Sequence, residues 1–156
     1  MSSETITTAL FLITAVIAAG VLINAVYPVV YNMAGTFSSA THESDLRMRT
    51  DFKVIATAAT ATEANIWMKN IGTERIAGND IRNGDVFFGK VGSFDRLVYS
   101  TDWDEEIAAP NDNDIWDPGE TLKITIYTSG LTSGEQLYFQ FSLPNGVWRS
   151  KEFTVS

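Results

Sequence analysis

The sequence predicts an α+β protein in which a long, hydrophobic N-terminal helix precedes an all-β, immunoglobulin-like antiparallel sandwich of about seven strands. Three observations predict this fold class: a long apolar run near the start, a hydrophobic period that changes from helical to two after Asp51, and turn residues between the later apolar segments. The 156 residues have room for one modest domain and an appendage. We therefore divide the chain into residues 1–50, a transmembrane helix and stalk, and residues 51–156, a β-sandwich domain.

The apolar run extends from Ala9 to Tyr31 and is interrupted only by Thr14, Gly20, Asn24 and Pro28. A helix of about 20 such residues crosses the hydrocarbon core of a bilayer, so a transmembrane helix is the first interpretation. The residues before the run include Glu4 and neither Lys nor Arg. Because a secretory signal peptide normally begins with basic residues, we expect this segment to be retained.

Two features of the apolar run bear on how it packs. Ala15 and Ala19 stand at the spacing that lets another helix approach closely, although alanines in membrane helices also face lipid. Pro28 supplies no N–H to the carbonyl of Asn24 one turn earlier. This predicts a kink or a polar contact at that level of the helix.

The helical pattern is expected to continue beyond the apolar run and to end near Thr50. Two acid-to-base pairs stand at i,i+4 in the order that suits a solvated helix: Glu43 with Arg47, and Asp45 with Arg49. Gly35 and the Ser38/Ser39 pair are expected to break the helix and to form a hinge or stalk.

Alternation of apolar and polar residues predicts the strands. The first strand follows Asp51, and its expected buried face carries Phe52, Val54, Ala56 and Ala58. Later strands are predicted at "ANIWMKN", "DVFFGK", "FDRLVYS" and "TLKITIY", and from Leu137 to Leu143. The segment "SLPNGVWRSKEFTV" places a Pro-Asn-Gly turn before a last strand, which predicts a C-terminal hairpin.

The densest polar segment is "TDWDEEIAAPNDNDIWDPGET", which contains neither Lys nor Arg. Its acids are Asp102, Asp104, Glu105, Glu106, Asp112, Asp114, Asp117 and Glu120. Oxygen-rich loops of this kind suit calcium, but the spacing does not match an EF-hand, because Trp116 and Pro118 stand where a ligand and a glycine are needed. The plainer interpretation is a solvated acidic loop between strands, in which "DPGE" forms the turn before the next strand. An acidic face for a protein partner is a further interpretation.

The sequence offers little for catalysis, and we predict that the protein is not an enzyme. It has no cysteine and a single histidine, His42, which follows the apolar run and is expected to be solvated. The four tryptophans suit either a sugar-binding surface or packing in the core and on sheet faces, and we expect packing: Trp67, Trp103, Trp116 and Trp148. We predict no catalytic, cofactor-binding or metal-binding residue. The net charge of −8 argues against nucleic acid as a partner.

The segment "AVIAAGVLINA" resembles the hydrophobic helix of archaeal flagellins (archaellins), which share their helix architecture with type IV pilins. The phrases "IWMKNIGTERI" and "DPGETLKITI" are similar to strand patterns of archaellin-like outer domains. Archaellins carry a short basic leader before this helix, whereas here Met1 is followed at once by "SSETITTALFL". An uncleaved archaellin-like helix on a sandwich looks more like the archaellum accessory (stator) proteins of the FlaG and FlaF type, and the opening is closer to FlaG.

This resemblance implies a non-enzymatic, single-pass protein of the cell membrane whose C-terminal domain lies outside the cell. It implies membrane lipid or neighbouring N-terminal helices around the apolar run. It also implies a surface-layer protein or other archaellum subunits as partners of the sandwich, in a homo- or hetero-oligomer. Such a stator component helps to hold the motor of the rotating filament against the surface layer.

Two other classes of function stay open at this point. The chain also resembles an archaellin- or pilin-like subunit of an extracellular filament, whose N-terminal helices bundle into the polymer core. Hydropathy does not separate this alternative from a membrane anchor, because the same apolar surface suits both environments. An exported domain that binds calcium or carbohydrate is the third class, and it draws on the acidic segment and the tryptophans.

Overall fold

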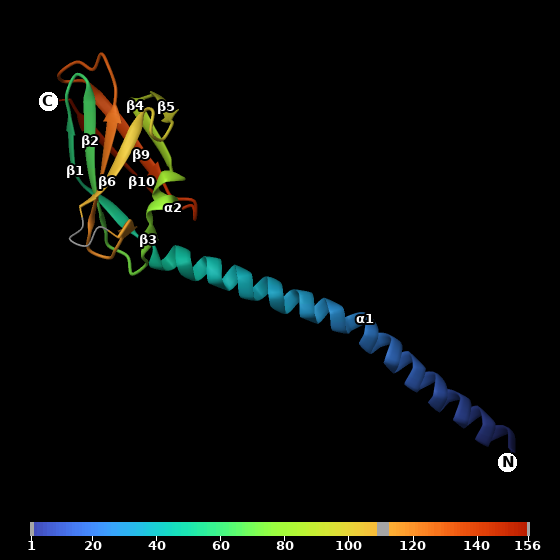
Figure 1. Ribbon diagram of the computed structural model, residues 1–156. Helices are drawn as coiled ribbons and strands as arrows, with labels where there is room; N and C mark the ends of the chain where they lie inside the picture. Colours follow the sequence, from blue (N-terminus) through green and yellow to red (C-terminus); the bar gives the residue numbers. More distant parts are fainter. Residues whose placement is uncertain (1, 109–112, 156) are drawn as a thin grey trace. The chain divides into compact units, whose positions relative to one another are not determined.

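The computed structural model describes residues 2–108 and 113–155. The chain forms two compact units, Met1–Glu43 and Ser44–Ser156. The described part of the first unit is helical, and the second unit contains the end of that helix together with the described strands (Figure 1). The last helical residues thus group with the sandwich, whereas the sequence pattern places the division near residue 50.

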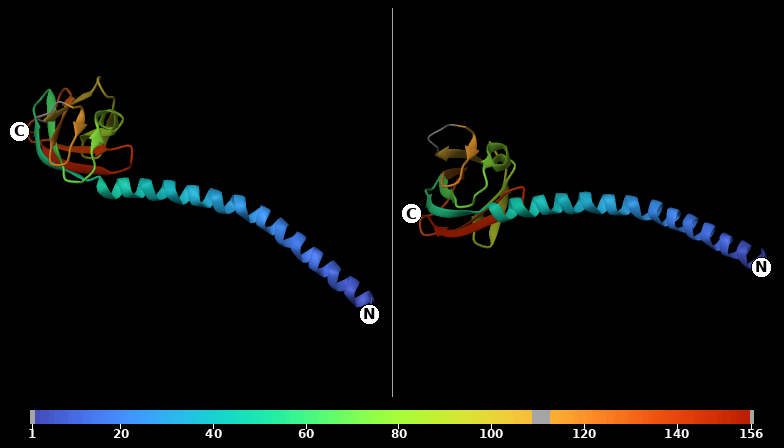
Figure 2. Two further views of the ribbon diagram at one scale, coloured as in Figure 1. Left: turned by 60° about the horizontal axis from the view of Figure 1, so that its bottom comes forward. Right: turned by 90° about the horizontal axis from the view of Figure 1, so that it is seen from below.

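Helix α1 runs without interruption from Ser2 to Arg49, so the expected break at Gly35 and the Ser38/Ser39 pair was wrong. The hydroxyl of Ser39 donates to the carbonyl of Gly35 at 3.2 Å, and Thr36 and Thr41 bond in the same way to the carbonyls four residues before them. These bonds satisfy the hydroxyl groups inside the helix. Helix α1 also continues through Pro28, and Figure 2 shows that the helix is curved.

The second unit is a sandwich of two four-stranded sheets with a short two-stranded ribbon (Figure 1). The first sheet has the order β1 (Phe52–Ala59), β2 (Glu63–Asn70), β8 (Thr121–Tyr127) and β6 (Trp103–Ala108). The second has the order β10 (Trp148–Thr154), β9 (Gln136–Ser142), β4 (Asp85–Lys90) and β5 (Ser93–Leu97). The ribbon pairs β3 (Ile76–Ala77) with β7 (Ile115–Trp116), and a short helix, α2 (Gly78–Arg82), follows β3.

The antiparallel sandwich that the sequence predicts is confirmed, and each predicted strand is present. The structure adds β3, β6, β7 and α2, so the described strands number ten instead of about seven. The predicted C-terminal hairpin joins β9 to β10. In its turn, the N–H of Gly146 donates to the carbonyl of Leu143 at 2.9 Å, and Gly146 has a φ of 81° that favours glycine.

Strand β1 does not keep the buried face expected for it. Its register with β2 shifts between Val54 and Ala56, where one extra residue forms a bulge. Because successive side chains in a strand point to opposite faces, the extra residue reverses the two faces beyond it. Phe52 and Ala59 are buried, whereas Ala56 and Ala58 are exposed, so the predicted inward position of these two alanines was wrong.

The hydrophobic core lies between the two sheets. Inward-facing side chains of β2, β8, β4 and β9 fill it: Ile66, Met68, Leu122, Ile124, Ile126, Val86, Phe88, Leu137, Phe139 and Phe141. The ring of Phe52 lies between those of Trp116 and Phe141, with centroids 5.7 and 5.6 Å away. Burial of each large apolar side chain contributes about 1.5–3 kcal/mol, so this cluster is the main source of stability.

The end of α1 is joined to the sandwich by backbone hydrogen bonds. The carbonyl of Arg49, in the last helical turn, accepts from the N–H of Thr73 at 2.9 Å. The carbonyl of Asp51 accepts from the N–H groups of Ile71 and Gly72, both at 2.9 Å. The loop after β2 therefore caps a helix end whose carbonyls lack intrahelical partners.

Replacing Gly72 with alanine is expected to destabilise the sandwich unit by about 1–3 kcal/mol. A Cβ at this position lies 2.3 Å from the carbonyl oxygen of Arg49 and 2.6 Å from the amide nitrogen of Asp51. The backbone of Arg49 and Asp51 cannot move away from the new Cβ without weakening the hydrogen bonds that cap the helix. Urea unfolding of the full chain in detergent micelles measures the loss by tryptophan fluorescence, because all four tryptophans lie in the sandwich unit.

The control for this substitution is Gly35→Ala, because nothing lies within 4 Å of that site. Its fluorescence transition should keep the wild-type midpoint. If Gly72→Ala also kept that midpoint, the close approach of the loop to the end of α1 would be contradicted.

Glu135, just before β9, gives the sandwich an acid-sensitive contact. The ammonium of Lys90 and the N–H of Thr132, 3.3 Å from its carboxylate, hold the pKa of Glu135 below its usual value of 4.5. A carboxylate with a lowered pKa stabilises the folded state above the unfolded-state pKa, and this contribution is lost as the pH falls through the folded-state value. The free energy of unfolding should therefore decrease as the pH falls below about 4.5. In the Lys90→Met variant, the free energy of unfolding should depend less on pH in this range. If the wild type and the variant showed the same pH dependence, the pairing of Lys90 with Glu135 would be refuted.

Candidate functional site

The apolar surface of α1 is the first candidate functional surface. No residue of the helix is buried, and its large apolar side chains between Ile6 and Phe37 range in exposure from 47% to 73%. Apolar residues lie on all sides of the helix, which is typical of a membrane span rather than of an amphipathic surface helix. The helix is long and apolar enough to cross a membrane. A contiguous apolar surface of this size marks a site of interaction with a membrane or a protein.

Polar groups within the apolar run are few, and one is satisfied inside the helix. The hydroxyl of Thr14 donates to the carbonyl of Leu10 at 2.8 Å, as a polar side chain in lipid requires. Asn24 is exposed on the helix surface. Ala15 and Ala19 are exposed as well, and the close approach of another helix at this pair stays a prediction. His42 is exposed on the same helix, as the sequence analysis expects.

The acidic segment is not a single solvated loop, and that expectation was wrong. Residues Trp103–Ala108 form β6, an edge strand of the first sheet, and Ile115–Trp116 form β7. Asp112 lies outside the described residues. The predicted turn at "DPGE" is present, because the N–H of Glu120 donates to the carbonyl of Asp117 at 3.1 Å.

The acids of this segment are engaged separately rather than gathered in one place. Asp104 accepts from the hydroxyl of Tyr127 at 3.1 Å, and the carboxylate of Asp102 accepts from the N–H of Val98 at 2.8 Å. The hydrogen bond to Asp104 is also the main cause that raises the pKa of Tyr127. Across residues 2–108 and 113–155, no group of three or more His, Asp and Glu side chains is arranged to hold a metal ion.

Arg82, at the end of α2, joins separate segments of the sandwich unit. Its Nε donates to Glu105 on β6 at 2.6 Å, and its terminal nitrogens donate to Asp114 at 2.5 and 3.1 Å. The side chain of Glu105 is only 6% exposed. Hydrogen bonds with Asp114 and Glu105 raise the pKa of Arg82, so its charge is retained at any physiological pH. The guanidinium therefore compensates a buried carboxylate on the edge strand.

Gly78 allows Asp114 to reach this arginine. The N–H of Gly78 donates to the carbonyl of Asp114 at 2.8 Å, and Asp114 has the left-handed φ of 55°. A Cβ on Gly78 would lie 2.2 Å from the carboxylate of Asp114. A larger residue at this position would displace the carboxylate of Asp114 from its place beside Arg82.

The tryptophans divide between the core and the surface. Trp103 and Trp116 are fully buried, which confirms the predicted packing role for both. The indole N–H of Trp116 donates to the carbonyl of Glu120 at 3.0 Å. Trp67 is half-buried on β2, and Trp148 is 52% exposed at the start of β10.

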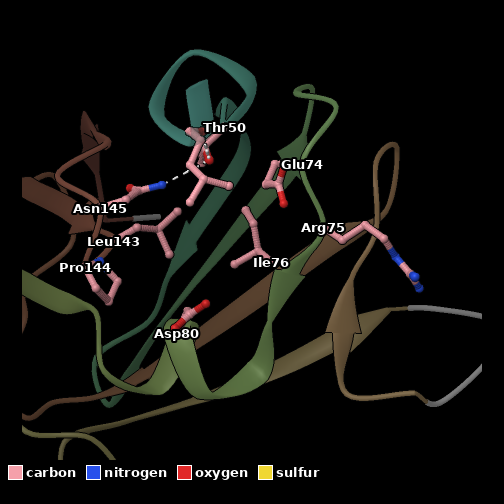
Figure 3. A pocket seen from close by; sticks show the side chains of 9 residues that line it. Thr50, Glu74, Arg75, Ile76, Asp80, Leu143, Pro144 and Asn145 are labelled. Carbon is pink, nitrogen blue, oxygen red and sulfur yellow. Dashed lines mark hydrogen bonds between the residues drawn. The ribbon is translucent and has the colours of Figure 1, made fainter. Parts of the chain in front are cut away.

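A pocket of about 320 Å³ in the sandwich unit is the second candidate site (Figure 3). Its lining residues are Leu46, Thr50, Glu74, Arg75, Ile76, Asp80, Leu143, Pro144 and Asn145. The amide of Asn145 donates to the hydroxyl of Thr50 at 3.0 Å, which links the β9–β10 hairpin to the residue after α1. Figure 3 shows the carboxylates of Glu74 and Asp80 directed toward the space between them, while the side chain of Arg75 points away. The pocket thus combines apolar walls with an acidic rim.

Sequence reasoning missed both this pocket and the role of Arg82. The lining residues come from the end of α1, the segment after β2, α2 and the β9–β10 hairpin, which are distant in the sequence. Helix α2 has five residues and is too short for a periodic signal. The Pro-Asn-Gly turn was the one recognisable local signal at the site, and it predicts a hairpin without indicating what the hairpin contacts.

Three known proteins are similar to this chain, one in sequence and two in structure. An uncharacterized protein of Archaeoglobus fulgidus is 27% identical to it over 99% of each chain. The sandwich is similar in structure to the archaellum periplasmic stator protein FlaG from Sulfolobus acidocaldarius, with a TM-score of 0.57 and 24% identity over 67% of this chain and 99% of that one. The stator protein complex of FlaF and FlaG from the same organism gives a TM-score of 0.55 and 23% identity over 65% of this chain and 87% of the matched one.

The structural similarity establishes a FlaG-like fold for the sandwich. A family model, that of the archaeal-type flagellins, matches residues 2–153 and therefore covers both the apolar helix and the sandwich. This match agrees with the resemblance of the helix sequence to that of archaellins. On this match, the chain belongs to the archaeal-type flagellin family.

Proposed function

We propose that this chain is a non-enzymatic, membrane-anchored component of the archaellum with a stator-type role. One observation carries the proposal: a helix whose apolar run from Ala9 to Tyr31 is uncovered is joined to a sandwich with the fold of FlaG. In this proposal, residues 1–50 are the transmembrane helix and stalk, and residues 51–156 are the domain outside the cell. Lipid then covers the apolar surface that no described part of the chain covers.

The sandwich is the part of the protein that meets partners in this proposal. FlaG from Sulfolobus acidocaldarius is described as periplasmic, and it is recorded in a complex with FlaF. These descriptions support an outer domain that contacts partner stator subunits or the surface layer, in a homo- or hetero-oligomer. A structural role is supported by the ionisable side chains of the sandwich, many of which bond to one another or to backbone groups as Arg82 does.

A filament subunit is the second candidate function, and the family match favours it. The family is named for archaeal flagellins, and its model extends over residues 2–153. In a filament, neighbouring helices would cover the apolar surface of α1 in place of lipid. The same exposed side chains serve either role.

Fractionation of cells that produce the protein separates the two functions. Mechanical shearing removes filaments, and mass spectrometry of the N-terminal peptide then identifies which form of the chain each fraction contains. A membrane fraction that holds the chain with residues 2–49 intact is the expected result. Recovery of the chain mainly in the sheared filaments, with a processed N-terminus, would replace the stator proposal with the filament subunit.

A further inference from the structure

The pocket of Figure 3 has apolar walls and a rim on which negative charge is incompletely compensated. Ile76 and Leu143 form walls that are 5% and 4% exposed, and Leu46 and Pro144 extend them. The carboxylate of Asp80 has no hydrogen bond or ion pair with any described residue.

Arg47, Arg49 and Arg75 lie beside the pocket, and none of them pairs with Asp80. Arg47 donates to the carbonyl of Asn145 instead. Arg75 forms a short ion pair with Asp117, 2.5 Å from Nε to Oδ1, and its guanidinium points away from the pocket. Arg49 lies 3.5 Å from the carboxylate of Glu74 and is shared with Asp45 at 3.7 Å. The pocket therefore presents one unpaired carboxylate and one that is partly paired.

These surroundings select the chemistry of an occupant. Asp80 is exposed, and an apolar group in the pocket would displace water from its carboxylate without supplying a compensating bond. An anion would be repelled by the rim. An occupant with a hydrocarbon stem and a cationic end suits both surfaces, because the stem can lie against Leu46 and Pro144, which are not fully buried, while the charge approaches Asp80 and Glu74.

We infer that the pocket is a docking site for a lysine side chain of a different, basic partner protein. Lysine fits because it carries a compact charge at the end of a four-carbon stem. A volume of about 320 Å³ holds such a stem together with several water molecules. A second copy of the chain is disfavoured because each copy has a net charge of −8, so two copies repel one another. The inference does not depend on the proposed stator role, because it rests on the pocket alone.

The first test uses a lysine side chain without a protein attached to it. Nα-acetyl-lysine methylamide is titrated into the full chain in uncharged detergent micelles, and backbone amide shifts are followed by NMR. Saturable shifts at Leu46, Ile76 and Asp80 are expected, and Asp80→Asn should weaken the binding about tenfold. Asp95→Asn, which removes an exposed carboxylate on β5, should leave the binding unchanged.

The neutral analogue Nα-acetyl-norleucine methylamide shows whether the charge matters in this titration. It has an apolar chain of similar shape without the ammonium, and it should produce no saturable shifts. Equal binding of the two compounds, or equal binding of lysine by wild type and Asp80→Asn, would overturn the inference. Tryptophan fluorescence in urea confirms that Asp80→Asn keeps the fold, so a loss of binding is not a loss of structure.

The second test asks whether the lysine belongs to another protein. A carbodiimide, which joins carboxylates and amines already in contact, is applied to intact cells, and linked peptides are identified by mass spectrometry. A lysine of another protein linked to Asp80 but not to Asp95 is the expected result. A linkage only to other copies of this chain, or no linkage at Asp80, would overturn the assignment of the partner.

Discussion

Replacing Arg82 with methionine should lower the free energy of unfolding of the sandwich unit by about 3 kcal/mol. Methionine keeps much of the length of the side chain but removes every hydrogen bond to Glu105 and Asp114. The carboxylate of Glu105, 6% exposed, would then be left in the protein without its cation. Removal of one partner of a buried pair costs more than the pair contributes, because the remaining charge has lost its water.

A double-mutant cycle separates this effect from a loss of packing. In the wild type, Glu105→Gln breaks the favourable pair between Glu105 and Arg82. In the Arg82→Met variant, the same substitution removes the carboxylate charge that has lost its partner. It should therefore be markedly less destabilising in that background, with a coupling energy of about 1–3 kcal/mol. The measurement is urea unfolding by tryptophan fluorescence, at constant detergent concentration.

The matched control for this arginine is Arg96→Met. Arg96 pairs with Asp85, and the two side chains are 65% and 43% exposed, so water screens their interaction. An exposed pair of this kind contributes about 0–1 kcal/mol, and the variant should unfold near the wild-type midpoint. If Arg82→Met and Arg96→Met lowered the free energy of unfolding by the same small amount, the proposed role of Arg82 in compensating a buried charge would be wrong.

Strand β6 shows why sequence reasoning missed part of the fold. Alternation identified β8 and β9 because their inward residues are apolar and their outward residues are polar. In β6 the inward residue Glu105 is itself a carboxylate, so no alternation of polarity is visible. The inward orientation of Glu105 depends on Arg82, which lies on a short helix far away in the sequence. No local pattern carries that information.

Strand β1 and helix α1 were misread for local physical reasons. A bulge between Val54 and Ala56 reverses the faces of β1, and a run of alanine and threonine gives no contrast that would reveal it. In α1, Gly35 and its serine neighbours are poor helix formers, yet the helix continues through them, and the hydroxyl of Ser39 bonds to the carbonyl of Gly35 one turn earlier. Apolar length, the strongest signal in the chain, was read correctly as a long helix.

The sequence alone reveals one of the two candidate sites, the apolar surface of α1, but not the other, the pocket around Asp80. The apolar run of α1 is continuous in the chain, so composition alone identifies it. The pocket around Asp80 is assembled from four separate segments, and each contributes only a few ordinary residues. Such a site appears only when the fold brings Leu46, Ile76 and Leu143 together.

Introducing two charges into the apolar run should release the protein from the membrane. In Ile17→Arg/Val21→Arg, each arginine near the centre of a membrane helix costs about 2.5–3.5 kcal/mol, or roughly 5–7 kcal/mol together. Each remaining aliphatic or Phe side chain contributes only about 0.3–0.6 kcal/mol to insertion, so the two arginines offset most or all of that sum. Both positions are more than 60% exposed on α1, and no described residue would shield the new charges.

Alkaline carbonate extraction of membranes, followed by immunoblotting, measures this release. The wild type should stay in the membrane pellet, and most of the double variant should move to the supernatant. Ser38→Arg/Thr41→Arg is the matched control, because it adds the same charge to the same helix outside the apolar run and should stay in the pellet. Tryptophan fluorescence should be alike in all three proteins, since the sandwich is unchanged. If the Ile17→Arg/Val21→Arg protein resisted extraction as the wild type does, the apolar run would not be the membrane anchor, because a span with two central arginines has lost the free energy that holds it in lipid.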